Sequence, residues 1–368
     1  MLQFAVLGVV LAACQAVTTV GDLGGEKDAE DLKPVAEEAV GSGAVQVAFL
    51  LPMTGAGSPI EESRGIRNGA LLAHEDLGKN QLTVTIADTG GQTDRMKAVS
   101  GQHASDGTDL LVVFGGDDDV ISASAGSVPV VALAPNSAPR PAGVFAFLFG
   151  DIDSLVKGIE FAALDGKKRI VLFSPRDNDR STFISQALSS RASIYSVTYG
   201  PRENAGAIVG RAGGSLEEAD AVAFAGSDEA IPRVAALIRA RGGGKLALIG
   251  HSGWPASILG KSALKGAIVA QPEVGDLRRI STRYKQKFGT EPKTEAAYGY
   301  DMVAIAAGIA RSAGADGLNR ASLLSQAGFR GATGAFRFRA DGSVERLYEI
   351  NTVQSGKLAP LARAPDRF

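Results

Sequence analysis

The chain has 368 residues, of which 45% are hydrophobic and 21% charged, a composition typical of globular proteins with room for two domains. Its formal net charge of −2 argues against nucleic acid as a partner, because nucleic-acid-binding proteins usually carry a basic patch. The single cysteine, Cys14, excludes an intramolecular disulfide and a zinc site built from several cysteines.

The N-terminal sequence has the pattern of a targeting segment. Residues 4–14, FAVLGVVLAAC, are about half as long as the ~20 residues of a membrane-spanning helix, so residues 1–14 are predicted to be a signal peptide. Their ending LAAC resembles the lipobox of bacterial lipoproteins, which implies that Cys14 carries a lipid. The absence of Lys and Arg from residues 1–4 departs from that pattern. A buried N-terminal strand with an incidental cysteine is the alternative.

Residues 15–44 contain seven acidic residues and two lysines, with no hydrophobic periodicity. Such a segment cannot bury enough apolar surface to fold alone, so we expect a flexible acidic tether.

From residue 45 onward, short apolar runs alternate with amphipathic stretches. Strands are predicted at 45–51, 82–88, 110–114, 128–133, 169–173, 193–199, 221–226, 246–250 and 267–270, and helices at 64–77, 152–164, 228–242 and 298–310. Asp341-Gly342 predicts the turn of a hairpin over 336–346. This alternation predicts an α/β protein with parallel sheets covered by helices on both faces. The strands are too many for one small sheet, so two doubly wound lobes joined by a hinge fit better.

Two regions carry a family resemblance. VAFLLPMTG at 47–55, GIRNGALLAHED at 65–76 and DTGG at 88–91, together with 284–314 and 329–357, resemble type 1 periplasmic binding proteins of the leucine/isoleucine/valine-binding group. The resemblance implies one lobe from 45–148 plus 273–340 and another from 149–272 plus 341–360. The lipobox and residues 51–55, 249–254 and 336–346 look similar to lipoproteins known as penicillin-binding-protein activators.

Ligands of open α/β sheets bind beyond the carboxyl ends of the strands, so we expect the ligand contacts there. They are Ser58, Gly116, Asp117, Asn136, Ser137, Asp177, Ser227 and Trp254. Ser58 has a second interpretation, as part of a strand-to-helix turn. Trp254 has one too, since it could be buried against a lobe or form a stacking wall of the cleft.

The segment GGDDD at 115–119 departs from the family. Relatives place a Ser here whose hydroxyl helps to hold the ligand's carboxylate, whereas Asp117 and its two neighbours would repel one. The acids either begin a short helix over 119–126 or lie in a solvated loop, or they contact a cation or amine, or they bind a metal. Only twelve residues separate Gly116 from Pro129, so a crossover helix is predicted to be shortened or lost.

A second departure is SPRDNDR at 174–180, where relatives have an aromatic residue that covers the ligand. Arg176 or Arg180 either pairs with an acidic ligand or belongs to a charged surface loop.

No enzymatic motif is present: the three histidines, His74, His103 and His251, lack metalloprotease spacing, and there is no Gly-x-Ser-x-Gly elbow. We therefore expect a protein that is not an enzyme and has no cofactor or metal. The first hypothesis is a lipid-anchored periplasmic solute-binding protein, which delivers an amino-acid-like or other polar small molecule to an ABC permease. The alternative is a penicillin-binding-protein activator-like lipoprotein that regulates or scaffolds peptidoglycan synthesis through a penicillin-binding protein.

Overall fold

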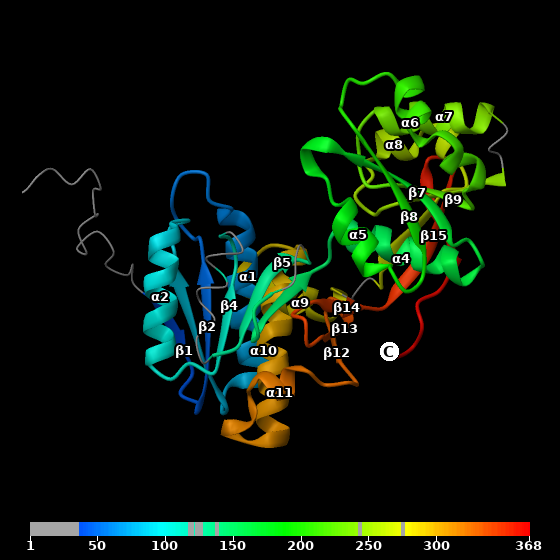
Figure 1. Cartoon of the computed structure of the whole chain (residues 1–368). Coiled ribbons are helices and arrows are strands. Elements are labelled where there is room, and N and C mark those ends of the chain that lie inside the picture. Colours follow the sequence, from blue (N-terminus) through cyan, green and yellow to red (C-terminus); the bar gives the residue numbers. More distant parts are fainter. Residues whose placement is uncertain (1–36, 117–120, 122–127, 137–139, 242–244, 274–276) are drawn as a thin grey trace, which may run out of the picture. The chain divides into compact units, whose positions relative to one another are not determined.

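A computed structural model describes residues 37–116, 121, 128–136, 140–241, 245–273 and 277–368, and Figure 1 labels its helices and strands. The predicted signal peptide with Cys14, and the tether up to residue 36, lie outside these residues. Within the described ranges, no helix has both the length and the apolar character needed to cross a membrane.

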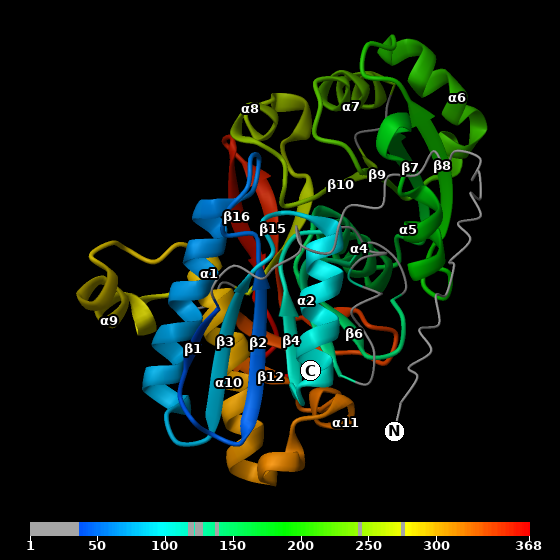
Figure 2. The ribbon, with the colours of Figure 1, turned by 90° about the vertical axis from the view of Figure 1, so that its left-hand side faces the viewer.

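The first lobe is built on a six-stranded sheet in the order β1-β3-β2-β4-β5-β6, and Figure 2 shows its first four strands side by side. The strands are β1 (Glu38–Val40), β2 (Val45–Leu51), β3 (Leu82–Asp88), β4 (Leu110–Val113), β5 (Val130–Pro135) and β6 (Val144–Leu148). Strands β2 to β6 run parallel, whereas β1 pairs antiparallel with β3. β1 falls inside the predicted tether; it forms because β3 offers a free edge and Arg67 Nε donates to Glu38 Oε2 at 2.6 Å.

Helices cover this sheet on both faces. Against the sheet lie α1 (Ile60–Ala73), which continues as a π-helical turn (His74–Gly78), α2 (Thr93–Ser105) and α10 (Thr294–Ala313), and Leu323 of α11 (Arg320–Leu323) joins the same core. α9 (Arg278–Phe288) packs instead on α1, away from the sheet (Figure 2). The helix predicted at 298–310 lies within α10, and Met302, Ile305, Ala306 and Ile309 on one side of it are buried in the core of this lobe.

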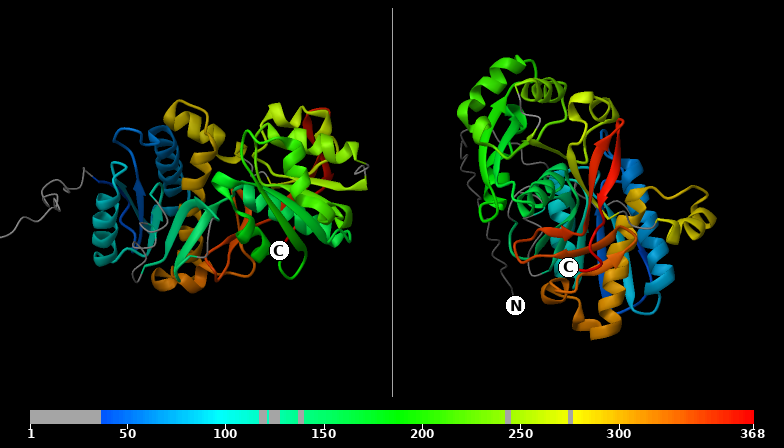
Figure 3. Two further views of the ribbon diagram at one scale, coloured as in Figure 1. Left: turned by 45° about the horizontal axis from the view of Figure 1, so that its top comes forward. Right: turned by 90° about the vertical axis from the view of Figure 1, so that its right-hand side faces the viewer.

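The second lobe has a seven-stranded sheet in the order β16-β15-β11-β10-β9-β7-β8. Its strands are β7 (Arg169–Pro175), β8 (Ser193–Tyr199), β9 (Ala221–Phe224), β10 (Ala247–Gly250), β11 (Ile268–Pro272), β15 (Tyr348–Gln354) and β16 (Lys357–Ala362). Its helices are α4 (Asp151–Leu164), α5 (Ser181–Ala187), α6 (Ala205–Glu218), α7 (Ala230–Ala240) and α8 (Ala256–Leu259). Strands β7 to β11 are parallel, and the antiparallel pair β15 and β16, red in Figure 3, extends the sheet from β11.

A small antiparallel sheet contains the predicted hairpin: β12 (Phe329–Gly331), β13 (Gly334–Phe338) and β14 (Val344–Arg346). Val344 packs into the core of the first lobe together with Phe336 and Phe338. The chain therefore enters the second lobe after Arg346, and not at residue 341 as the family resemblance implied.

The chain crosses between the lobes three times, from β6 to α4, from β11 to α9 and from β14 to β15. The predicted fold class, two doubly wound lobes with parallel sheets joined by a hinge, is confirmed.

Candidate functional site

A pocket of about 180 Å³ opens where β2, β3 and β4 end. Its lining comes from the loops that follow these strands and from the start of α2: Pro52, Ala56, Gly57, Ser58, Pro59, Thr89, Gly91, Gln92, Thr93, Met96, Phe114, Gly115 and Gly116. Two predicted residues, Ser58 and Gly116, thus lie in one pocket. We call it the strand-end pocket.

The carboxylate of Asp88 fixes the shape of this pocket. It accepts hydrogen bonds from the backbone N–H of Met53 (2.9 Å), Thr54 (3.2 Å) and Gly90 (2.8 Å), and from the Thr54 hydroxyl (2.5 Å). Burial alone would raise the pKa of Asp88, but these bonds outweigh it and hold the pKa below its usual value. Asp88 is therefore charged, and its oxygen atoms accept hydrogen bonds from the loops that follow β2 and β3.

Glycines keep the pocket open. A Cβ on Gly91, whose φ is +67°, would lie 2.5 Å from Ser58 Oγ, and Gly115 has a φ of +80°. Both backbone conformations favour glycine over any residue with a side chain.

Thr89 was not among the predicted residues. It is fully buried, its N–H donates to the Leu51 carbonyl at 2.9 Å, and its own carbonyl accepts from Gln92 N–H at 3.0 Å. Its Oγ1 has no hydrogen-bond partner among the described residues, although Thr89 lines the pocket. Sequence reasoning missed it because a threonine after a strand does not reveal whether its hydroxyl is paired.

Asn136 lies elsewhere, in a second pocket of about 440 Å³ that also borders α4, α5 and β14. Its Nδ2 donates to Asp153 Oδ1 at 2.7 Å and to the Val344 carbonyl at 3.1 Å, and its Oδ1 accepts from Val344 N–H at 3.1 Å. Burial raises the pKa of Asp153 to about 6. The Asn136 amide thus ties β14 to the first turn of α4.

The carboxyl ends of the second sheet hold Asp177, Ser227 and Trp254. Asp177 is exposed in a short 3₁₀ turn, Arg176–Asn178. Trp254 is 4% exposed, and its Nε1 donates to the Gly226 carbonyl at 3.0 Å. Its ring centroid lies 6.3 Å from that of Phe224. Trp254 therefore belongs to the second core and forms no open stacking wall.

The two arginines of 174–180 are engaged within the protein. Arg176 Nη2 lies 3.7 Å from Glu203 Oε2, and Arg180 Nε donates to Asn178 Oδ1 at 3.1 Å. These contacts are those of a charged surface loop.

Ser227, His251 and Asp151 have the residue types of a hydrolytic triad. Ser227 Oγ lies 3.3 Å from His251 Nε2, and Asp151 Oδ1 lies 3.6 Å from Nδ1 of the same ring. His251 Nε2, however, also lies 2.9 Å from the Gly226 carbonyl, to which it must donate its proton. A nitrogen that donates there cannot take a proton from Ser227, so the array lacks the geometry of an activated nucleophile.

His251 also affects the charge of Asp151. The nearby imidazole holds the pKa of Asp151 below its usual value, against the opposing effect of burial. Asp151 is the first residue of α4, where the helix dipole also favours a negative charge.

Two predicted contacts, Asp117 and Ser137, lie outside the described residues, as does nearly all of the predicted helix 119–126. Among residues that the structure describes, no group of three or more His, Cys, Asp or Glu side chains is arranged to hold a metal ion.

Comparisons with known proteins agree with this architecture. A family model described as periplasmic binding protein matches residues 44–357. A search of curated proteins gave no match.

Several solved structures share the fold. A protein from Rhodospirillum rubrum, described as a branched-chain amino acid ABC transporter, has a TM-score of 0.66 and 18% identity, with 86% of this chain and 99% of that chain covered. A leucine-binding protein from Thermotoga maritima has a TM-score of 0.53 and 20% identity, with 88% and 99% covered. An ABC transporter substrate-binding protein from Desulfitobacterium hafniense has a TM-score of 0.57 and 15% identity, with 86% and 99% covered.

Proposed function

The chain belongs to the periplasmic binding protein family, and from this premise we propose that it captures a small polar solute for an ABC importer and catalyses no reaction. The observation that carries the proposal is the strand-end pocket, because it lies where open α/β sheets bind their ligands. An amino-acid-like solute is supported by the structural relatives described as leucine-binding or branched-chain amino acid proteins.

Thermal unfolding in the presence of candidate solutes tests this proposal. A ligand that binds the folded state alone, at about 100 times its dissociation constant, should stabilise the protein by ~2.7 kcal/mol. We expect at least one amino acid to raise the melting temperature and to bind by calorimetry. A screen of amino acids, polyamines and small peptides without any hit would refute the transport function.

We further propose that the protein is held at a periplasmic membrane surface by a lipid on Cys14, with an acidic tether before the first lobe. The support is the lipobox-like ending of the apolar segment. Cys14→Ser should abolish incorporation of labelled palmitate in the bacterium and release the protein from membranes. Lipid that persisted on this variant would show that the anchor lies elsewhere.

One observation favours the alternative of a regulatory lipoprotein. Trp254 is buried, the Tyr199 hydroxyl donates to Asp228 at 2.7 Å, and His251 is nearly inaccessible. Many side chains at the strand ends of the second lobe are therefore engaged in contacts within the protein and are not available to a ligand. Crosslinking in cells separates the two functions. Recovery of a penicillin-binding protein without any permease would favour regulation, and recovery of a permease would favour transport.

A further inference from the structure

We propose that the ligand's carboxylate binds at the connection from β3 to α2, between the Thr89 hydroxyl and the N-terminus of α2, and not after β4 as in the relatives that hold it there with a Ser. This inference rests on the proposed function and deepens it, because it assigns one chemical group of the ligand to one part of the strand-end pocket.

The first observation is the unpaired hydroxyl of Thr89. Its side chain is fully buried, lines the pocket and makes no hydrogen bond through Oγ1 within the described part of the chain. Buried hydroxyls without a partner are rare because they forfeit their bonds to water. A ligand oxygen in the pocket would supply the missing partner.

The second observation is the start of α2, a helix of 13 residues. Gln92 occupies the N-cap position of α2, and the Gln92 side chain accepts no hydrogen bond from the backbone of the first turn. The Gln92 carbonyl accepts a hydrogen bond from Met96 N–H. Gln92, Thr93 and Met96 all line the pocket. The helix dipole and its unsatisfied N–H groups favour an anion at this end.

The neighbouring charges are mixed, because Asp94 lies in the first turn of α2 and the buried Arg95 follows it. Asp88 is charged, but its four hydrogen bonds come from Met53, Thr54 and Gly90, so its field is partly compensated by donors. After β4, in contrast, the sequence places Asp117 and two further acids where relatives have the carboxylate-holding Ser. A ligand carboxylate would meet like charges there, whereas the β3–α2 connection offers a hydroxyl and a helix dipole.

An NMR titration of the full chain with acetate, a minimal carboxylate, tests the inference, and acetamide serves as a neutral probe of the same shape. Acetate should shift the backbone amides of Gly91 and Thr93 with saturation, and acetamide should not. Thr89→Val keeps the side-chain shape and removes the hydroxyl, so it should weaken acetate binding about tenfold or more, as expected for a hydrogen bond to a charged group. Thr83→Val is the matched control, because Thr83 lies at the other end of β3 and donates to the Gly43 carbonyl.

Each outcome decides the question. Equal shifts by acetamide, no saturable shift by acetate, or unchanged acetate affinity in Thr89→Val would each overturn the inference. Calorimetry with L-leucine and the other amino acids, run on the same proteins, reports on transport separately. Acetate binding that depends on Thr89 without any amino acid binding would uphold the carboxylate site while refuting the proposed function. Amino acid binding that is unaffected by Thr89→Val would uphold the proposed function and refute the carboxylate site.

Discussion

Arg346 is a charged side chain whose environment the sequence does not reveal. It is 5% exposed, its Nη2 donates to the Phe147 carbonyl at 2.8 Å, and its Nη1 donates to the Thr333 carbonyl at 3.2 Å. Its guanidinium also lies 4.8 Å from the ring centroid of Phe147. Burial lowers the pKa of Arg346, partly offset by nearby acidic groups.

We expect Arg346→Met to lower the free energy of unfolding by about 3 kcal/mol, because buried carbonyls lose their donors and Asp301 loses a nearby compensating charge. Arg330→Met is the control, since Arg330 pairs with Glu273 at 2.8 Å but is half exposed; its effect should stay below ~1 kcal/mol. Urea unfolding measures both. Equal losses of unfolding free energy in the two variants would contradict the argument that burial makes Arg346 the more important residue for stability.

Asp153 and Asp151 occupy the same helical turn, yet they should respond to pH in opposite directions. The pKa of Asp153 is raised to about 6 by burial, so the folded state binds its proton more tightly than the unfolded chain does. As the pH rises from about 4 to about 6, this residue should therefore remove about 3 kcal/mol of stability. Asp153→Asn should abolish that decline, as measured by urea unfolding between pH 4.5 and 7.5.

The pKa of Asp151 is lowered, first by its interaction with His251. Its stabilising contribution is present at neutral pH and lost as the pH falls toward the folded-state pKa. Asp151→Asn should consequently lower stability most at neutral pH. If both asparagine variants changed the pH profile in the same direction, the assignment of the two environments would be wrong.

At the scale of elements, α1 and α10 pack so closely that glycine is required at their contact. A Cβ on Gly69 would lie 1.9 Å from the Ala296 carbonyl oxygen, and one on Gly299 would lie 1.9 Å from that of Ile66. Backbone oxygens cannot move aside without shifting a helix, so an added methyl group separates the pair.

Gly299→Ala should therefore destabilise the protein by about 2–3 kcal/mol, although alanine is intrinsically the better helix former. Gly308→Ala is the control on the same helix, because, apart from its own stretch of helix, no atom of the described residues lies within 4 Å of its added Cβ; it should be neutral or stabilise by up to ~1 kcal/mol. Thermal unfolding of the two variants measures the contrast. A stabilised Gly299→Ala would mean that the helices move apart freely.

The elements also show why the fold was more predictable than the site. The runs at 45–51, 82–88 and 193–199 became β2, β3 and β8 with unchanged bounds, because short apolar or alternating runs of this length are the pattern of a strand. β6, with the sequence VFAFL, was not predicted, although it is as apolar as the runs that were.

The candidate site depends on pairings that only the folded chain decides. Ser58 and Gly116 do lie in one pocket. The Thr89 hydroxyl, which has no partner among the described residues, and the burial of Trp254 follow from contacts between distant segments. The position of residues at strand ends predicted where the pocket lies, but it did not reveal which side chains remain available to a ligand.

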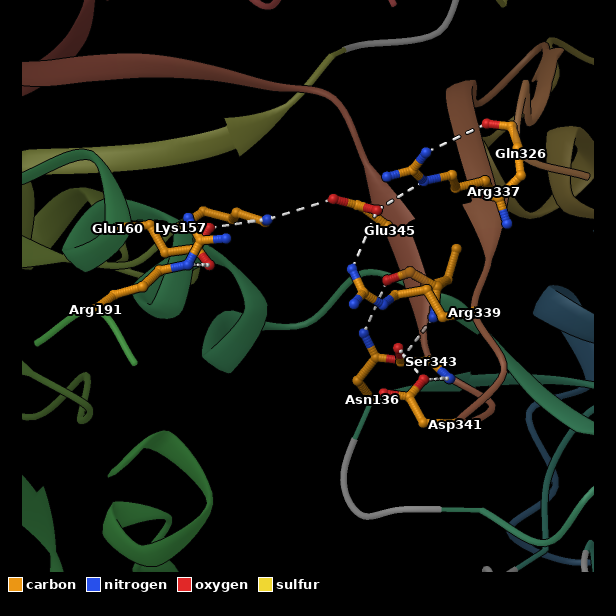
Figure 4. A network of polar contacts seen from close by, with 11 residues as sticks. Asn136, Lys157, Glu160, Arg191, Gln326, Arg337, Arg339, Asp341, Ser343 and Glu345 are labelled. Atoms are coloured by element: carbon orange, nitrogen blue, oxygen red, sulfur yellow. Dashed lines mark hydrogen bonds and ion pairs between the residues drawn. The ribbon is translucent and has the colours of Figure 1, made fainter. Parts of the chain in front are cut away.

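At the scale of the whole molecule, an ion-pair network connects the hairpin β13–β14 with α4 and with Arg191, which lies four residues after the end of α5 (Figure 4). Glu345 Oε2 accepts from Arg337 Nε at 2.8 Å within the hairpin, and Lys157 Nζ of α4 lies 3.9 Å from Glu345 Oε1. Lys157 is itself bound to Glu160 at 2.9 Å, and Arg191 lies 3.6 Å from Glu160. The hairpin end of the network is thus the more closely paired, and the link between the lobes is its longest contact.

This difference in distance predicts how strongly Glu345 couples to each cation. Double-mutant cycles that combine Glu345→Gln with Arg337→Met or with Lys157→Met measure the two couplings separately. The pair within the hairpin should give about 1–2 kcal/mol, as a charge-assisted hydrogen bond that is largely shielded from water. The pair between the lobes should give less than ~1 kcal/mol, because its atoms are beyond hydrogen-bond distance. A weak ion pair of this kind leaves the hydrogen bond from Asn136 Nδ2 to Asp153 Oδ1, at 2.7 Å, as the shorter polar contact between the lobes. A coupling of Lys157 to Glu345 as large as that of Arg337 would contradict this ranking of the contacts by distance.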